Sequence, residues 1–420
     1  MSAVGRADRR AHGRGGPASR VSPRLLIALL GAVQIVSWGS LYYSFSLFVL
    51  PLQAEFGWSL TAMNGALTAA LMVAGLCAYP VGALIDRHGG RRLMTAGALG
   101  AAVLLAGWST VTSLTGFYLV WIGLGVCMSA VLYEPLFVVL TYHFREHATR
   151  AITALTLIAG FASTVFMPLI ETLLAYWPWR TVALILAAFN LLCCVPVYAW
   201  LLPAPPAIGP TPAAAAPVPA AAHPPALRAR LRDPVFCGLT LWFTAYSGTA
   251  SGLMFQLVPY LKSFAVDNTS LLITVALVGP AQVAGRALLM LAGERGDPVK
   301  VGAITTALTP LAVLVLVLAP PALPWLALFA VTFGLANGIT TILRGTVPAA
   351  WLGHAHFGKT MGLIAAPMMI AAALAPLATA AIWSASDNPQ AMQWAVFAFA
   401  LFGPAGYWLA VGARARRTPD

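Results

Sequence analysis

The sequence predicts an all-α membrane protein with twelve transmembrane helices in two pseudo-symmetric six-helix bundles. Composition is the first observation: hydrophobic residues make up 60% of the 420 residues, and the mean hydropathy is +0.83. A soluble fold of this length cannot bury so much apolar surface. Long apolar stretches are the second observation, since each span needs roughly 20 apolar residues and about a dozen fit. These stretches do not alternate with polar residues as barrel strands do, so we expect helices.

The predicted helices fall into two groups of six, at residues 25–202 and 234–412. Residues 1–24 and 413–420 are basic tails. Residues 203–233 begin with a run of Pro and Ala, which cannot bury a core and predicts an extended, semi-stiff linker. Pro51 is expected to break the first helix. The expected helices are 25–50, 60–84, 93–112, 114–142, 151–174, 181–202, 234–259, 269–292, 299–319, 323–347, 359–383 and 391–412.

The distribution of basic residues is the third observation. About twenty of the 24 Lys and Arg residues lie in the tails and in the turns after every second helix. The opposite loops hold only Arg180 and Lys262. This asymmetry predicts a multi-pass protein of the cell inner membrane with both termini cytoplasmic. It also accounts for the net charge of +12 without a nucleic-acid partner.

One turn concentrates charge in a chain of which only 9% is charged. Residues 82–92 read GALIDRHGGRR between the second and third predicted helices, which makes them a tight, water-facing turn. A weak internal repeat is also present, at an offset of about 210 residues. It places Glu134 and Arg344 at nearly equivalent positions in the two halves.

Together these features resemble the major facilitator superfamily of secondary transporters. The resemblance rests on twelve spans in two halves, the long central loop and the turn GALIDRHGGRR. It implies two halves that rock around a central site. A weaker similarity points to the branch of monocarboxylate porters and oxalate/formate exchangers. It is carried by YYSFSLFVLPLQAEFGWS and by an arginine in the eighth helix.

The resemblance implies that the basic turn latches the two halves together on the cytoplasmic side. Asp86 would accept hydrogen bonds at the N-terminus of the helix that begins near Lys359, where the helix dipole favours an anion. The following arginines would pair with acids such as Glu146 or contact lipid headgroups. The alternative is a purely topogenic loop. The expected latch residues are Gly82, Asp86, Arg87, Gly90, Arg91 and Arg92.

The interior charges are the other candidates for gating. An isolated charge within a span costs a few kcal/mol, so Glu134 and Arg344 should each have a partner. One interpretation pairs them with each other across the halves as a gate. The alternatives pair Glu134 with Arg91 or Arg92, or let it carry a proton.

Arg286 is the main candidate for contacting substrate. Its planar guanidinium suits a carboxylate, and in the resembling branch an arginine of the eighth helix contacts the substrate anion. The alternative is a structural arginine that reaches the cytoplasmic face near Glu294. Proton-coupled monocarboxylate porters have an acidic residue one turn before the arginine of the eighth helix, where this chain has Gln282. They also have a lysine in the first helix, where this chain has Tyr43. Both titratable positions are therefore missing, which argues against proton coupling by that route and against simple lactate-type transport.

Polar and aromatic residues of the first helix and of the tenth are expected to line the central cavity, although interhelical packing is the alternative for each. Together with Arg286, the expected substrate-binding residues are Gln34, Trp38, Tyr42, Tyr43, Gln282 and Asn337.

The sequence thus predicts a secondary transporter, expected as a monomer, of a small molecule, with an organic anion favoured because buried cations outnumber Glu134. Without a nucleotide motif, metal cluster or catalytic constellation, we expect no cofactor, no metal and no enzyme activity. Transport would then draw on a gradient, coupled to a proton or a counter-anion, and membrane lipid is the other expected partner. The alternatives are an efflux pump for drug-like compounds and a non-transporting membrane sensor.

Overall fold

The computed structural model describes residues 22–202, 227–292 and 297–417. Within these ranges the regular elements are helices, as predicted. Nine helical stretches there are long and apolar enough to span a membrane. One of them, Leu114–Tyr176, contains two of the predicted crossings, and helices Gly90–Trp108 and Pro234–Ser263 complete the twelve. Residues 1–21 and 418–420 of the tails, most of the linker and Glu294 lie outside the described residues.

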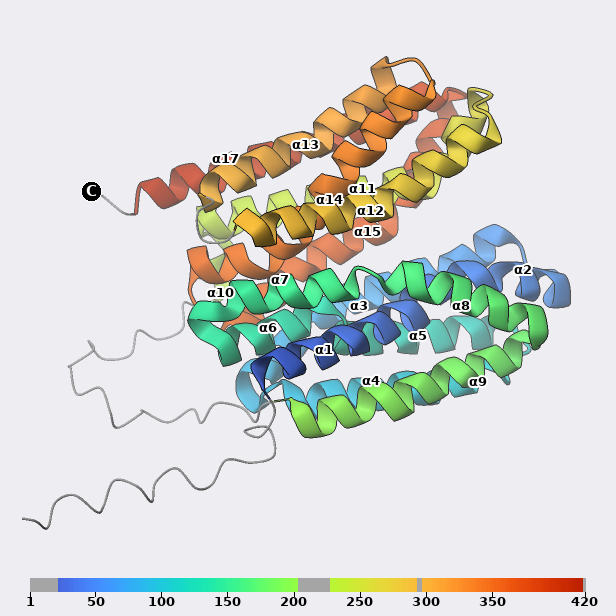
Figure 1. The fold of residues 1–420 in the computed structure, drawn as a ribbon, viewed down its shortest axis with the longest axis horizontal. Coiled ribbons are helices and arrows are strands. Elements are labelled where there is room, and N and C mark those ends of the chain that lie inside the picture. The colour runs from blue at the N-terminus through green and yellow to red at the C-terminus, as the bar shows by residue number, and fades with distance from the viewer. Residues whose placement is uncertain (1–21, 203–226, 293–296, 418–420) are drawn as a thin grey trace, which may run out of the picture.

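The first six crossings form one half of the molecule, here called the N-half, drawn blue to green in Figure 1. Its helices are α1 (Pro23–Trp38), α2 (Ser44–Phe56), α3 (Leu60–His88), α4 (Gly90–Trp108), α5 (Leu114–Val131), α6 (Tyr133–Phe144), α7 (Ala148–Ala159), α8 (Ala162–Tyr176) and α9 (Trp179–Phe189). Short π- and 3₁₀-helical segments join them: η2 (Gly39–Tyr43), η3 (Arg145–His147), η4 (Asn190–Cys194) and η5 (Val197–Leu201).

The last six crossings form the C-half, drawn yellow to red. A short helix at the end of the linker precedes them, and the Pro- and Ala-rich run 203–226, which was predicted to be extended, lies outside the described residues. The helices are α10 (Leu227–Leu231) and then α11 (Pro234–Ser263), α12 (Asn268–Ala292), α13 (Pro298–Leu318), α14 (Leu323–Leu352), α15 (Phe357–Ser386), α16 (Pro389–Ala400) and α17 (Phe402–Ala415).

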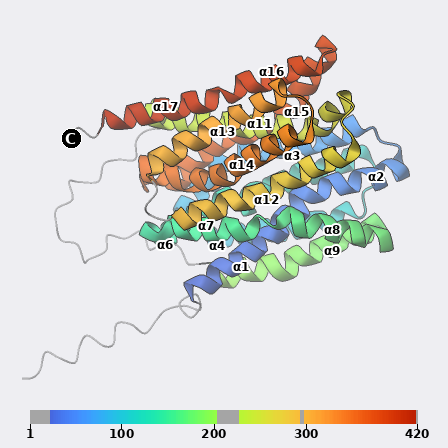
Figure 2. The ribbon, with the colours of Figure 1, turned by 45° about the horizontal axis from the view of Figure 1, so that its top comes forward.

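The helices of both halves run along the long axis of the molecule, as Figure 2 also shows. We call the end at which α1 begins and α17 ends the proximal end, and the opposite end the distal end. In Figure 1 the two halves lie closest at the proximal end and separate toward the distal end. The main contacts between halves join α3, α6 and α7 to α12, α14 and α15, whereas α2 and α8 pack mainly within the N-half.

The hydrophobic cores follow the same division. The N-half has one large core, which extends across the interface to Phe357 and Met361 of α15. The C-half has a distal core and a proximal core, and the proximal core includes Ala78 of α3. Apolar packing therefore joins the halves at the proximal end, which is what holds that end closed.

Three helices of the N-half depart from the continuous spans predicted for them. The first crossing does not break at Pro51: it continues to Phe56 and ends at Gly57, which has a φ of +67°. Proline inside a membrane helix is tolerated because neighbouring groups satisfy the freed carbonyl. The fourth crossing breaks at Leu132, where ψ is −160°, and the fifth breaks between α7 and α8 at Gly160. The break at Leu132 precedes Pro135, which thereby lies in the first turn of α6, where the missing N–H of proline leaves no helical hydrogen bond unmade.

Candidate functional site

Three charged side chains lie inside the bundle where the halves meet. Glu134 comes from α6, and Arg286 and Arg344 come from α12 and α14. All three helices belong to the contact between halves, with α6 against α14 and α12 against α7. The charges thus lie where a movement of one half against the other would change their surroundings.

Glu134 and Arg344 form an ion pair across the halves. The Nη2 atom of Arg344 lies 3.1 Å from Oε1 of Glu134, and the side chains are only 12% and 9% exposed. The break at Leu132 puts Glu134 in the first turn of α6, where the helix dipole favours a negative charge. Of the pairings considered from the sequence, the structure contains this one.

Arg286 reaches the other helix break. Its side chain is 4% exposed, and its Nη1 atom donates a hydrogen bond to the backbone carbonyl of Thr156 at 2.9 Å. Thr156 lies in the last turn of α7, and its carbonyl also accepts the N–H of Gly160 at 2.9 Å. A cation is favoured at this end of a helix because of the helix dipole. Gly160 lies so close to Nη1 that a Cβ there would overlap it. The Nε atom of Arg286 is buried without a partner among the described residues.

An aromatic cluster, formed by Trp38, Tyr42, Tyr43 and Tyr133, lies beside these charges. The ring centroid of Trp38 is 5.0 Å from that of Tyr133 and 5.4 Å from that of Tyr42. Tyr42 and Tyr43 belong to the π-helical segment η2, in which Ser44 N–H donates to Gly39 five residues earlier. π-Helical turns recur at functional sites because they redirect side chains.

Members of the aromatic cluster interact electrostatically with Arg286. Both Tyr43 and Tyr133 lie within Coulombic range of the Arg286 guanidinium, and so does Tyr246 of α11. The Tyr246 hydroxyl donates to the side chain of Asn337. Rings from the N-half and Tyr246 from the C-half therefore interact electrostatically with the same cation.

Two predicted lining residues have a different environment. Gln34 is fully buried within the N-half, where its Nε2 atom donates to Val131 O at 2.7 Å and to Tyr198 Oη at 3.3 Å. Gln34 therefore takes the interhelical packing alternative. Gln282 lies one turn before Arg286, and its backbone packs against Gly338 of α14.

Asp86 lies at the N-terminus of α15. Its carboxylate accepts hydrogen bonds from the backbone N–H groups of Gly358 at 2.7 Å and Lys359 at 2.9 Å. The hydroxyl of Tyr142 donates to the same carboxylate at 2.7 Å and accepts from the N–H of Phe357 at 2.9 Å. This contact, predicted for Asp86 from the sequence, joins α3, α6 and α15 at the proximal end.

Of the other predicted latch residues, one contacts the C-half and two contact only the N-half. Gly82 lies against Gly358 of α15, so closely that a Cβ on either would meet the other's backbone. Gly90 instead packs on Val139, and the Nε atom of Arg91 donates to the carbonyl of Ala199; both contacts are internal to the N-half. The side chains of Arg87 and Arg92 are exposed.

Sequence reasoning missed four participants. Tyr133, Tyr142 and Tyr246 resemble the other aromatic residues of apolar helices, and no sequence signal distinguishes them. Thr156 acts through its backbone carbonyl, which any residue could provide. Pro135 was the available signal, since it marks the helix break that positions Glu134.

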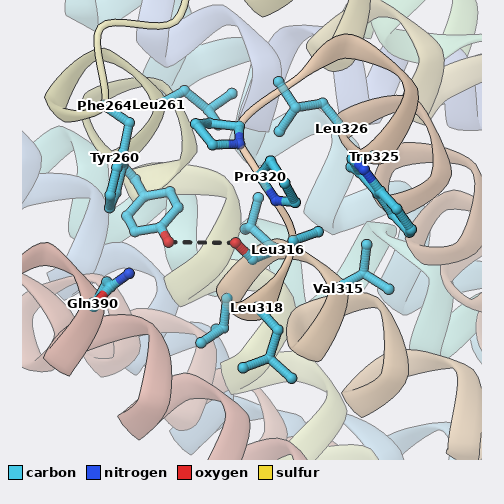
Figure 3. A pocket seen from close by; sticks show the side chains of 13 residues that line it. Tyr260, Leu261, Phe264, Val315, Leu316, Leu318, Pro320, Trp325, Leu326 and Gln390 are labelled. Atoms are coloured by element: carbon cyan, nitrogen blue, oxygen red, sulfur yellow. Dashed lines mark hydrogen bonds between the residues drawn. The ribbon is translucent and has the colours of Figure 1, made fainter.

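A pocket lies away from these residues, at the distal end of the C-half (Figure 3). Its volume is about 240 Å³, and its walls include Tyr260, Trp325 and Gln390. Tyr260 donates to the Leu316 carbonyl at 3.4 Å across it. None of the predicted site residues lines this pocket, so we do not assign the substrate to it.

Comparison with known proteins gives a family match. The sequence model described as "Major Facilitator Superfamily" matches residues 29–300. A search of curated proteins found no match.

Solved structures of transporters resemble the whole chain. FucP, described as a Major Facilitator Superfamily transporter in the outward conformation, superposes with a TM-score of 0.70 at 13% identity. The alignment covers 96% of this chain and 100% of that one. The human organic anion transporter MFSD10 (TETRAN) gives 0.67 at 17% identity, covering 94% and 100%. A second structure of the E. coli fucose:proton symporter FucP gives 0.68 at 13% identity, covering 95% and 99%.

Proposed function

Because this chain belongs to the Major Facilitator Superfamily of secondary transporters, we propose that its substrate is a small organic anion, bound by Arg286. It moves across the membrane as the two halves rock around the layer of charges. The solved relatives include both an organic anion transporter and a fucose:proton symporter. At their low identity this likeness concerns the fold, so the choice of an anion rests on residues of this chain.

The observation that carries the proposal is the unbalanced guanidinium of Arg286. Arg344 has a carboxylate partner in Glu134. Arg286 instead bonds a neutral backbone carbonyl, and its Nε atom has no partner among the described residues. A buried cation of this kind is costly unless an anion neutralises it. A substrate carboxylate would do so and could bond the guanidinium bidentately.

Binding of that carboxylate would couple to movement of the halves. In the present state Arg286 of the C-half bonds the end of α7 in the N-half. A carboxylate competes for the same guanidinium and would weaken this bond. The substrate would thereby change a contact between the halves, as alternating access requires.

The Asp86 contact serves as the proximal gate in this proposal. It caps α15 only while the halves are together at that end, so it stabilises the proximally closed state. Asp86→Asn keeps the size of the side chain but weakens its hydrogen bonds. We expect this variant to insert normally and to transport more slowly; normal transport would contradict the gate.

The proximal end is the cytoplasmic side in this proposal, and the membrane is the inner membrane. Support comes from the basic residues at that end, including Arg87, Arg145 and Arg228, against Arg180 and Lys262 at the other. The present state is then outward-facing. Reporter fusions to each terminus test this, since a periplasmic signal from either would refute it.

The driving ion is a proton or a counter-anion, and the transporter works as a monomer surrounded by lipid. A proton route different from that of the monocarboxylate branch is needed, because Gln282 and Tyr43 do not titrate near neutral pH. Uptake into proteoliposomes distinguishes the two ions. Uptake that requires a pH gradient indicates a proton, and uptake that requires anion preloaded inside the vesicles indicates a counter-anion.

The test of the substrate is a thermal-shift series on the purified chain. Small carboxylates, inorganic anions and lipophilic cations are compared with the wild type and with Arg286→Ala. We expect stabilisation by carboxylates that the substitution removes, with an affinity loss of roughly 10- to 100-fold for a charge-assisted bond. Arg286→Lys, which keeps the charge but not the fork, should bind with intermediate affinity. Stabilisation by lipophilic cations alone would refute the proposal and favour an efflux pump.

A further inference from the structure

The charges around Arg286 limit the charge of the substrate. The interior layer holds the guanidinium groups of Arg286 and Arg344 and the carboxylate of Glu134. Since Arg344 and Glu134 pair with each other, a single positive charge remains. A monoanion would neutralise it, whereas a dianion would leave a buried negative charge with its own desolvation cost.

The aromatic cluster limits the shape of the substrate. Trp38, Tyr42 and Tyr43 are half-buried and therefore keep some accessible ring surface inside the bundle. Tyr42 and Tyr43 meet edge to face, with ring centroids 5.4 Å apart. Trp38 packs on Tyr133 with ring centroids 5.0 Å apart, and Glu134, the next residue, pairs with Arg344 at 3.1 Å. Tyr43 also interacts electrostatically with Arg286. An accessible aromatic surface thus adjoins the group that would hold the carboxylate.

Aromatic surfaces discriminate between flat and saturated rings. Aromatic pairs in stacked or edge-to-face geometry gain interaction beyond the area they bury. A saturated ring of the same size gains only the burial, and a short hydroxy acid would leave the rings unused. The expected preference for an aromatic over a saturated ring is roughly two- to tenfold in affinity.

From the single unpaired charge and the adjoining rings, we infer that the substrate is a monocarboxylate attached to a planar aromatic ring. This inference rests on the proposed function, because it assumes that Arg286 binds the substrate anion. It adds the class of anion: one carboxylate, on a flat apolar body that packs against Trp38 and the tyrosines of η2.

The test compares four probes on the full-length wild-type protein by thermal shift and by competition in proteoliposomes. Benzoate has one charge and a flat ring, and cyclohexanecarboxylate has the same charge and a saturated ring. Phthalate adds a second carboxylate, and benzamide removes the charge. We expect benzoate to bind two- to tenfold tighter than cyclohexanecarboxylate, and phthalate and benzamide to bind more weakly than both.

Substitutions then locate the preference. Trp38→Leu should bring benzoate and cyclohexanecarboxylate to similar affinities while keeping the response to carboxylates. Trp58→Leu is the matched control, because Trp58 is also half-buried but stacks on Phe56 in the distal loop region. It should leave the preference unchanged. If Trp38→Leu does not fold, the four probes on the wild type still decide.

The outcomes separate the two proposals. Equal binding of benzoate and cyclohexanecarboxylate, or binding of phthalate as tight as benzoate, overturns the substrate class. If Arg286→Ala still removes that binding, the proposed function stands. If no carboxylate gives a response that depends on Arg286, both proposals fail.

Discussion

The two halves of this molecule use their helices differently. In the N-half the fourth and fifth crossings are interrupted, at Leu132 and Gly160, and the first contains a π-helical turn. In the C-half the corresponding α14 and α15, and also α12, run without interruption. The interrupted half contributes the acid Glu134 and the backbone carbonyl of Thr156, which lies in the last turn of α7. The continuous half contributes the two arginines that bond them.

This difference explains how a pseudo-symmetric fold obtains an asymmetric centre. Each break exposes a helix end, and a helix end carries partial charge and unpaired backbone groups. In the first turn of α6 the acid Glu134 pairs with Arg344, and in the last turn of α7 the Thr156 carbonyl accepts from Arg286. An uninterrupted helix can offer only side chains, which is the role of Arg286 and Arg344. The following variants test this contrast, from the largest expected effect to the smallest.

The first variant separates the acid of the N-half from the cation of the C-half. Arg344→Met leaves Glu134 buried without a partner, which should lower the stability by about 3–5 kcal/mol. The thermal melting temperature in detergent should fall by several degrees. The double variant Arg344→Met with Glu134→Gln should recover part of this loss. An unchanged melting temperature in the single variant would show that the halves do not depend on the pair.

The second variant pushes the halves apart at the contact between α3 and α15, two helices that are not interrupted. A Cβ in Gly82→Ala would overlap the backbone of Gly358, at an overpacking cost of about 1–3 kcal/mol. The proximal end should open, so spin labels at Arg87→Cys and His354→Cys in a background without native cysteines should move apart. Gly279→Ala is the control, because a Cβ there meets no atom within 4 Å. Equal label distances in both variants would contradict a tight α3–α15 contact.

A smaller effect is expected at the edge of the Asp86 contact. Tyr142→Phe removes the hydroxyl that joins α6 to Asp86 and to α15, worth about 1–2 kcal/mol. The proximally open population should rise in the same label measurement. Tyr118→Phe is the matched control, because the Tyr118 hydroxyl donates to the Ala62 carbonyl within the N-half at 2.8 Å. It should lower stability without changing the label distance; a shift of equal size would remove Tyr142 from the gate.

The smallest effect concerns how the uninterrupted α12 begins. The hydroxyl and the N–H of Ser270 hold the pKa of Asp267 below its ordinary value. Because the folded pKa is lowered, the stabilisation is complete above an ordinary aspartate pKa of about 4. It is lost as the pH falls through the lowered value. Asp267→Ala should therefore melt below the wild type at pH 7, and the difference should shrink in acid. A constant difference would mean that the charge is not involved.

Much of the fold followed from the sequence because hydropathy and charge act locally. A run of apolar residues indicates a span wherever it lies, and basic turns indicate one side of a membrane. These rules predicted twelve crossings in two halves, and the family match and the structure confirm that fold. They also singled out Asp86 and Arg286, because charges are rare in this chain. Pro51 was misread, since a proline that breaks a helix in water is tolerated in a packed membrane helix.

The sequence by itself determined the class of protein and which residues are chemically unusual; the tertiary structure decided what each of them contacts. Arg286 and Thr156 are 130 residues apart, and Tyr142 and Phe357 are 215 apart. No local pattern relates residues at such separations, because their proximity depends on how two whole halves pack. The helix breaks belong to the same category. Both breaks lie where a residue of the other half contacts them: Arg344 pairs with the Glu134 side chain in the first turn of α6, and Arg286 donates to the Thr156 carbonyl in the last turn of α7.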